Sequence, residues 1–448
     1  MDPARSAALS VLRAVRVEGG YTNLVLPAVL AEAGLSGRDA AFVTELASGT
    51  IRRRATYDAI IEACLDRPLR KVESVVLDCL RLGAHQLLAM RVPSHAAIST
   101  TVDLARQRKG AGAGGFANAV LRRVAEHDLA TWIDRVAPAR PDDLHGRLAI
   151  AESHPRWVVD ELATALGEAA DELEALLAAD NEPPRVTLVA RPGLADPAEL
   201  PGRRTSLSPF GVELGGGDPA AITAVAEGRA GVQDEGSQLV ALALAGADVE
   251  GRDERWIDLC AGPGGKAALL AALAAGRGAG LVGTELHHHR AALVARSAGA
   301  GLLAAVQTDA TRAPFADGSV DRVLLDAPCT GLGALRRRPE ARWRRSPGDL
   351  GELVDLQRRL LAEALRVVRP GGVVLYATCS PVLSETSGIV APVLEARPDV
   401  VLEDAAPALR SAGATVPDRA EGPLPGTVQL WPHRHGTDAM FLALLRRR

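Results

Sequence analysis

The chain has 448 residues, which predicts two or three domains, and its hydrophobic content of 47% is sufficient for sizeable cores. Its net charge of −4 excludes attraction of nucleic acid by bulk positive charge. The sequence contains no run of about 18 uninterrupted apolar residues, so no membrane span is expected. An odd number of cysteines, five, and the lack of an apolar leader favour a cytoplasmic protein with free thiols over a disulfide framework.

Residues 1–135 are expected to form an all-α domain. Apolar residues recur at helical spacing in several segments, for example from Val75 to Met90, where the pattern ends before Pro93. No segment of this region alternates apolar and polar residues as a half-buried strand does.

Residues 136–225 are expected to form a small α+β subdomain. Prolines such as Pro138, Pro155 and Pro184 interrupt this region, and a short apolar strand is expected at 185–189. The region lacks the aromatic residues of an RNA-recognition sheet. We interpret residues 136–225 as a linker or an accessory RNA-binding element.

Residues 226–448 alternate between strand and helix patterns. This alternation predicts an α/β domain with a doubly wound, Rossmann-like and mostly parallel sheet. The expected strands are 256–259, 281–285, 305–308, 322–326, 373–377, 400–403 and 441–445. Ligands of such sheets lie beyond the carboxyl ends of the strands, where Asp258, Glu285, Asp309, Asp326 and Cys379 occur.

A glycine turn follows the strand at 256–259 and precedes a helix. Gly262, Gly264 and Gly265 have no Cβ, so a ligand can lie on their backbone next to a helix N-terminus. The turn would suit a dinucleotide, a phosphate or S-adenosylmethionine. It lacks the dinucleotide glycine spacing, and it is not a P-loop because Ala267 follows Lys266.

Two cysteines end neighbouring strands of the expected sheet. Cys329 follows Asp326, and Cys379 follows the strand at 373–377, so both sulfurs and the carboxyl group are expected in one pocket. Cys64 and Cys79 lie in helical patterns and are expected in a core. A thiolate, an acid and a nucleotide-sized cofactor together suit methylation of carbon 5 of a pyrimidine, because thiolate addition at carbon 6 makes carbon 5 nucleophilic. Lys266 could assist by lowering the pKa of the thiol.

Segments 41–54, 91–98 and 115–123 resemble signatures of NusB-like RNA-binding domains. The resemblance implies a helical module that contacts RNA. Its candidate phosphate contacts are Arg52, Arg53, Arg54, Arg122 and Arg123. A solvated helix face is the alternative interpretation of these clusters.

Segments 258–266, 326–331 and 378–380 together resemble the RNA (cytosine-5) methyltransferase family of the Fmu/Sun type, with 232–238 similar to the lead-in of its catalytic domain. Enzymes of this architecture methylate a cytosine in small-subunit ribosomal RNA. The resemblance implies S-adenosylmethionine as the cofactor and ribosomal RNA as the partner, with transfer RNA as an alternative. We also expect a monomer without metal. It also implies three parts: 1–135, 136–225 and a methyltransferase domain at 226–448.

The resemblance also implies roles for individual residues. Cys379 matches the nucleophile, Cys329 the second thiol of product release, Asp326 the acid at the cytosine, and Lys266 the pocket lysine. The matching cofactor residues are Cys260, Ala261, Gly262, Pro263, Gly264, Gly265, Lys266, Glu285, Asp309 and Asp326. Glu285 departs from the family, which more usually has Asp; either acid can hold ribose hydroxyls.

An arginine-rich stretch at 336–345 follows the first thiol motif. We interpret it as an RNA clamp, in which guanidinium groups bind phosphates and Trp343 stacks on a base. The clamp residues are Arg336, Arg337, Arg338, Arg342 and Trp343. Surface charge with one anchored tryptophan is the alternative. The histidines at 287–289 are not expected to bind a metal, because adjacent helical residues point about 100° apart.

Two other classes of protein remain as alternatives. A non-catalytic RNA-binding factor on a methyltransferase scaffold would have lost the thiols or the glycine turn, and both are present. A nicotinamide-dependent oxidoreductase would carry the dinucleotide glycine spacing and would leave the paired thiols unexplained.

Overall fold

In the computed structural model, which describes residues 2–299 and 301–448, the chain divides into two units. Unit 1 comprises Met1–Glu182 and Leu335–Arg344, and unit 2 comprises Pro183–Ala334 and Arg345–Arg448. Among the described residues, no helix is both long enough and apolar enough to cross a lipid bilayer.

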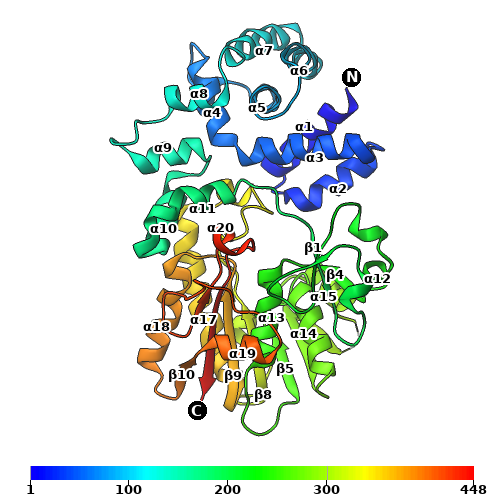
Figure 1. Ribbon diagram of the computed structural model, residues 1–448, viewed down its shortest axis with the longest axis vertical. Helices are drawn as coiled ribbons and strands as arrows, with labels where there is room; N and C mark the ends of the chain where they lie inside the picture. Colours follow the sequence, from blue (N-terminus) through cyan, green and yellow to red (C-terminus); the bar gives the residue numbers. More distant parts are fainter. Residues whose placement is uncertain (1, 300) are drawn as a thin grey trace. The chain divides into compact units, whose positions relative to one another are not determined.

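Unit 1 is all-α (Figure 1), and the prediction of an all-α domain at residues 1–135 is confirmed. Its longer helices are α1 (Pro3–Val17), α2 (Thr22–Glu32), α3 (Gly37–Arg52), α4 (Arg54–Ala63), α5 (Ser74–Leu88), α6 (Ser94–Lys109), α7 (Ala111–Val124), α8 (Leu129–Val136), α9 (Leu144–Ala151), α10 (Arg156–Leu166) and α11 (Leu173–Ala179). Asp2 begins α1 by accepting a hydrogen bond from the backbone of Arg5, with Pro3 in the first turn. Helix α5 is buried from Val76 to Gln86, because helices pack on it from several sides.

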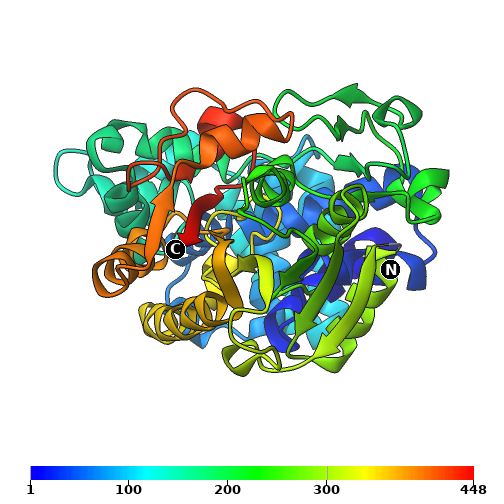
Figure 2. The ribbon, with the colours of Figure 1, turned by 90° about the horizontal axis from the view of Figure 1, so that it is seen from below.

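Unit 2 contains an eight-stranded mixed sheet. Its strands are β5 (Arg255–Asp258), β6 (Gly280–Glu285), β7 (Leu302–Gln307), β8 (Val320–Asp326), β9 (Val368–Thr378), β10 (Val400–Glu403), β11 (Val428–Gln429) and β12 (Phe441–Arg447). The order is β10-β12-β9-β8-β5-β6-β7, with β11 paired to β12. The five strands from β9 to β7 are parallel, and β12 runs antiparallel to β9. Figure 2 shows the sheet from below, with helices on both sides of it.

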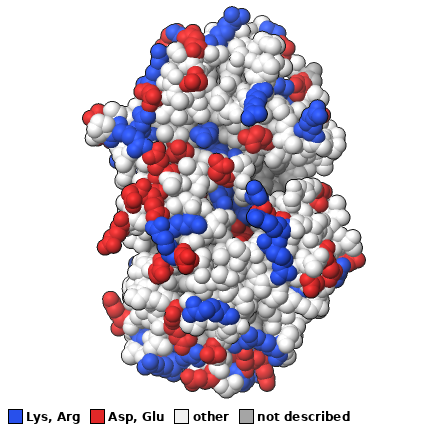
Figure 3. All heavy atoms as spheres, in the orientation of Figure 1, with Lys and Arg blue, Asp and Glu red and all other residues white. Residues whose placement is uncertain are grey.

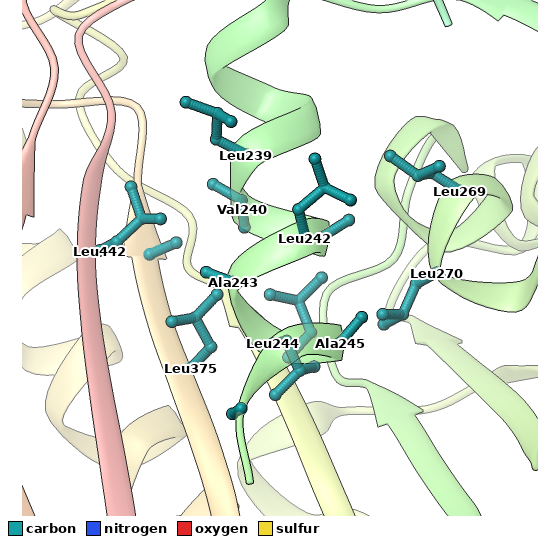
Figure 4. Close-up of a cluster of buried hydrophobic side chains, with 14 of the residues drawn as sticks. Leu239, Val240, Leu242, Ala243, Leu244, Ala245, Leu269, Leu270, Leu375 and Leu442 are labelled. Atoms are coloured by element: carbon teal, nitrogen blue, oxygen red, sulfur yellow. The ribbon is translucent and has the colours of Figure 1, made fainter. Parts of the chain in front are cut away.

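Alternate residues of the central strands face two separate cores. In β9, Val373 and Leu375 face the core that contains α13 (Glu235–Gly246) and α14 (Gly265–Ala275), whereas Val374 and Tyr376 face the other. Figure 4 shows leucines of α13 beside side chains of α14, β9 and β12. Both faces of the central strands are buried, which explains their apolar sequences.

The remaining helices of unit 2 are α12 (Thr223–Ala226), α15 (His288–Ala298), α17 (Pro347–Val367), α18 (Ser387–Ala396), α19 (Ala405–Ser411) and α20 (Pro432–His435). Helix α16 (Ala341–Arg344) belongs to unit 1.

A second, four-stranded antiparallel sheet also lies in unit 2. It consists of β1 (Thr187–Ala190), β2 (Arg203–Arg204), β3 (Gly211–Glu213) and β4 (Ala230–Val232) in the order β2-β3-β1-β4. The expected subdomain 136–225 is therefore divided: its helices α9 to α11 belong to unit 1 and its strands to unit 2. The boundary expected near residue 225 would also separate β4 from β1, with which it pairs.

Candidate active site

The strand order places the site at the carboxyl ends of β5 and β8. From β5 the chain moves to β6 and β7 on one side, and it returns to β8 and β9 on the other. This reversal is the topological switch point at which parallel sheets bind ligands. Asp258 ends β5, and Asp326 ends β8.

The glycine turn after β5 has little room for other side chains. A Cβ on Gly262 would lie 2.0 Å from Oε2 of Glu285, and Gly264 adopts a φ of +116° as the N-cap of α14. A Cβ on Gly265 would meet no heavy atom within 4 Å. The turn thus packs closely against the end of β6 on one side and leaves open space above the start of α14 on the other.

Asp258 is an almost fully buried acid at this turn. Its Oδ1 accepts a hydrogen bond from the backbone nitrogen of Cys260 at 3.2 Å, and its Oδ2 has no donor among the described residues. Burial, followed by the negative charge of Asp326, raises the pKa of Asp258 to about 7. An acid of this kind is suited to a positively charged ligand, which would favour its ionised form.

The pKa of Asp258 predicts a pH-dependent stability. Because the pKa of Asp258 is higher in the folded chain than in the unfolded chain, the contribution of this carboxyl group to stability is fully present below pH about 4. It is lost as the pH rises through about 7, where the buried group must ionise. Asp258→Asn should therefore raise the free energy of unfolding at pH 8 by about 2–4 kcal/mol and have little effect at pH 4. Urea unfolding of the ligand-free chain at both pH values measures the difference; an equal effect at both would contradict it.

Lys266 and Asp326 form an ion pair beside the turn. Nζ of Lys266 lies 2.8 Å from Oδ2 of Asp326. Burial lowers the pKa of Lys266, but the charge and hydrogen bond of Asp326 and the charge of a Cys379 thiolate raise it overall. Since this attraction is mutual, the ammonium group also stabilises negative charge on the Cys379 sulfur.

The two expected thiols lie next to each other. Strands β8 and β9 pair in parallel, with Asp326 opposite Ala377, and the loops that follow bring the sulfurs of Cys329 and Cys379 to 3.4 Å. The hydrogen bond to Cys379, then burial, raises the pKa of Cys329 well above its ordinary value. Either sulfur can be the donor in this contact, and the raised pKa favours the protonated form of Cys329.

The remaining expected cofactor residues lie at the ends of β6 and β7. Glu285 is buried; its Oε1 accepts a hydrogen bond from the backbone nitrogen of His287 at 3.0 Å, and its Oε2 lies 3.5 Å from Nε of Arg290. Asp309 is exposed and caps η5 (Ala310–Arg312) through Thr311. Within residues 2–299 and 301–448, no group of three or more metal-ligating side chains gathers.

The expected RNA clamp is largely built into unit 1. Arg342 is 0% exposed, and it donates hydrogen bonds to the carbonyl oxygens of Ser153 at 3.0 Å and Asp180 at 3.1 Å and to Oδ1 of Asn181 at 2.9 Å. Arg52 is also buried and donates to the carbonyl oxygen of Arg336 at 3.4 Å. The expectation that Arg342 and Arg52 bind phosphates is therefore wrong, because their guanidinium groups are enclosed and bonded to protein oxygens.

Other members of the expected clamp also have structural contacts. Nε1 of Trp343 donates to the carbonyl oxygen of Ile51 at 2.8 Å, and the guanidinium group of Arg54 lies 5.5 Å from the centre of its ring. Arg336 is buried. Arg338 is exposed and lies over the ring of Tyr21, and Arg53 and Arg337 are half-buried. On the face shown in Figure 3, basic side chains are interspersed with acidic ones.

The burial of Arg342 predicts a large effect on stability. Arg342→Met should lower the free energy of unfolding by about 3 kcal/mol or more, since it leaves several buried oxygens without a donor. The matched change of the exposed Arg338 to Met should cost less than about 0.5 kcal/mol. Urea unfolding measures both. A fall in the salt dependence of RNA binding by folded Arg342→Met would contradict the structural role.

Two family models match the chain in separate regions. The model described as 16S rRNA methyltransferase RsmB/F matches residues 248–446 and therefore covers the large sheet. The NusB family model matches residues 2–126, which lie in unit 1.

Similar proteins match over nearly the whole chain. A candidate methyltransferase of Mycobacterium tuberculosis H37Rv, Rv1407, is 51% identical over 451 residues, covering 100% of this chain and 97% of its own. Ribosomal RNA small subunit methyltransferase B of Sodalis glossinidius is 32% identical over 418 residues, covering 88% of this chain and 90% of its own.

Solved structures share the fold. The crystal structure of PH0851 has a TM-score of 0.80 at 22% identity and covers 100% of this chain and 99% of that one. The structure of NSun6 from Pyrococcus horikoshii with SFG has a TM-score of 0.55 at 17% identity, covering 66% of this chain and 99% of its own. With the paired thiols, the glycine turn and the matches over the full length, the chain belongs to the RsmB/F family of 16S rRNA methyltransferases and is an RNA methyltransferase.

Proposed function

We propose that the chain methylates carbon 5 of a cytosine in small-subunit ribosomal RNA, with S-adenosylmethionine as the methyl donor. The observation that carries the proposal is the sulfur pair of Cys329 and Cys379 at 3.4 Å, next to the ion pair of Lys266 and Asp326. Methylation at an exocyclic nitrogen or a ribose oxygen does not need a thiol, whereas carbon 5 of a pyrimidine must be activated by addition at carbon 6.

The residues at the switch point fit S-adenosylmethionine. The open space above Gly265 admits a ligand to the turn, and the unpartnered Oδ2 of Asp258 suits a molecule that carries a sulfonium and an amino group. We assign the ligand to the turn at 260–266, the ribose hydroxyls to Glu285, and further contacts to Asp309 and Asp326. When bound, S-adenosylmethionine supplies an electrophilic methyl group.

We assign the nucleophile to Cys379. Lys266 stabilises its thiolate, which can accept a hydrogen bond from the Cys329 thiol 3.4 Å away. The Cys379 sulfur adds to carbon 6 of the cytosine, and the electron pair of the carbon 5–carbon 6 double bond becomes available at carbon 5. Asp326, held through Oδ2 by Lys266, is assigned to the N3 edge of the cytosine; in its protonated form it donates a hydrogen bond to N3, which gains negative charge on addition, and so stabilises the adduct.

The second thiol then acts in release. Once the Cys379 sulfur is bonded to carbon 6, it carries no negative charge and is a weaker hydrogen-bond acceptor, so its hydrogen bond and its charge raise the pKa of Cys329 less than before. Cys329 can then lose its proton to solvent and take the proton from carbon 5. The carbon 5–carbon 6 double bond re-forms, and Cys379 leaves as a thiolate with the electron pair of the carbon–sulfur bond.

Bisulfite sequencing tests the proposal directly. Small-subunit ribosomal RNA from cells that lack the protein is incubated with the purified chain and S-adenosylmethionine, and transfer RNA is treated in parallel. The expected result is one new bisulfite-resistant cytosine in the ribosomal RNA. Methylation of transfer RNA alone would replace the substrate, and methylation at any atom other than carbon 5 would overturn the chemistry.

A further inference from the structure

Glu385 is a fully buried acid close to both thiol loops. It ends η6 (Leu383–Glu385), six positions after Cys379, and is 0% exposed. We propose that Glu385 is a positioning residue that holds the Cys329 loop against Cys379 and so sets the distance between the two sulfurs. The proposal rests on the proposed function for its catalytic meaning, but its geometric part can be tested separately.

The carboxylate of Glu385 holds the residue next to Cys329. Its Oε1 accepts a hydrogen bond from the backbone nitrogen of Thr330 at 2.8 Å, and its Oε2 accepts one from the Thr330 hydroxyl at 2.5 Å. Backbone and side chain of Thr330 are thus fixed by one acid. This pair of bonds limits the directions in which the preceding Cys329 can point.

A glutamine of α17 holds the other side of Cys329. Nε2 of Gln357 donates one hydrogen bond to the carbonyl oxygen of Pro328 at 2.8 Å and the other to Oε1 of Glu385 at 3.0 Å. Both partners are acceptors, so the amide nitrogen must face them. The residues before and after Cys329 are therefore tied, directly or through Gln357, to the same carboxylate.

The same acid is also joined to the loop that carries Cys379. Because Thr330 has one hydroxyl proton and gives it to Glu385, Ser380, whose Oγ lies 3.1 Å away, must be the donor to Thr330. The hydroxyl of Tyr376 donates to the carbonyl oxygen of Glu385 at 2.7 Å. A continuous set of hydrogen bonds thus runs from both neighbours of Cys329 to the end of β9 and the residue after Cys379.

Glu385→Gln should disturb this set with little change of volume. A glutamine amide has an oxygen that accepts and a nitrogen that donates. If the nitrogen takes the place of Oε1, the Thr330 backbone and Gln357 lose their acceptor; if it takes the place of Oε2, the Thr330 hydroxyl must turn its proton toward Ser380. A shift of the sulfurs by about 1 Å can cost about 100-fold in rate, so we expect kcat to fall by about 10- to 100-fold. The KM values for RNA and S-adenosylmethionine should change less than about twofold, because neither binding region changes.

Asp321→Asn is the matched control. Asp321 is also 0% exposed and lies on β8, but at the end opposite to Asp326. It accepts hydrogen bonds from Arg369 at 2.6 Å and from the backbone nitrogens of Glu254 and Arg255 at 2.8 Å. The control should lower the melting temperature and leave kcat of the folded protein unchanged.

Oxidation by diamide provides a measurement that does not depend on methylation. Diamide takes one hydrogen from each thiol and becomes a hydrazine while the Cys329–Cys379 disulfide forms. The rate, followed by mass spectrometry of the peptides, should be roughly tenfold lower in Glu385→Gln, because the sulfurs are held less closely. Asp321→Asn should react as the wild type does.

The outcomes separate the two proposals. Wild-type rates of both disulfide formation and methylation in folded Glu385→Gln would overturn the positioning role. If the wild type methylates no cytosine but Glu385→Gln still slows disulfide formation, the positioning role is supported and the proposed function is rejected. If Glu385→Gln does not fold, Thr330→Val removes the bond to Oε2 and the one from Ser380 but leaves the bonds to Oε1, and it should slow both reactions in the same direction; wild-type rates there would overturn the role.

Discussion

Replacing Cys379 with alanine is expected to reduce methyl transfer by about 10⁴-fold or more, because no other sulfur is in position to add to carbon 6. The neighbouring Cys329 does not substitute for it, because the burial that raises the pKa of its thiol remains in the variant and its sulfur lies on the other loop, 3.4 Å from the position of the Cys379 sulfur. Binding of S-adenosylmethionine should be unchanged within about twofold, because the glycine turn belongs to other strands. Single-turnover methyl transfer and calorimetric binding measure the two effects.

Cys64→Ala is the matched control for this experiment. Cys64 is a buried free thiol of unit 1, and its loss should reduce stability but not methyl transfer. RNA that contains 5-fluorocytidine adds a second measurement, because fluorine at carbon 5 cannot leave as a proton does and the adduct persists. The wild type and Cys64→Ala should give a slow band on a denaturing gel, and Cys379→Ala should give none. Appreciable turnover by Cys379→Ala would assign the nucleophile elsewhere.

The sequence was sufficient to predict the parts of the site that depend on regular structure. Buried parallel strands are apolar runs with abrupt ends, so the strand expected at 322–326 lies within β8, and the strand expected at 373–377 lies within β9. Once two such strands are neighbours, the residues after their ends must meet. This is why Cys329 and Cys379 could be brought together from sequence alone, although 50 positions separate them.

The errors concern residues whose surroundings come from distant segments. An arginine run has the same sequence whether it is solvated or enclosed, and the oxygens that enclose Arg342 belong to residues such as Ser153 and Asn181. Glu385 was missed because it ends a three-residue 3-10 helix, which is too short to show a periodic pattern, and its partners Thr330 and Gln357 lie in other segments. Asp258 was placed at a strand end, but its raised pKa depends on burial that the sequence does not specify.

Replacing Cys329 with alanine is expected to stop the reaction after the methyl group has been transferred. The adduct at carbon 6 would form, because Cys379 and Lys266 are intact, but no thiolate would take the proton from carbon 5. Without removal of that proton, the carbon–sulfur bond cannot break. We therefore expect about one methyl group per protein molecule, and turnover lower by about 10²- to 10⁴-fold, the usual contribution of a general base.

A protein–RNA band on a denaturing gel, formed with unmodified RNA, measures the trapped adduct. Cys329→Ser distinguishes proton transfer from packing: serine still donates a hydrogen bond toward Cys379, but its hydroxyl ionises far less readily than a thiol, so the band should persist. If packing against Cys379 were the only role, serine would restore turnover and the band would disappear. The double change of Cys329 and Cys379 to alanine should give no band, since the sulfur that forms the bond is absent.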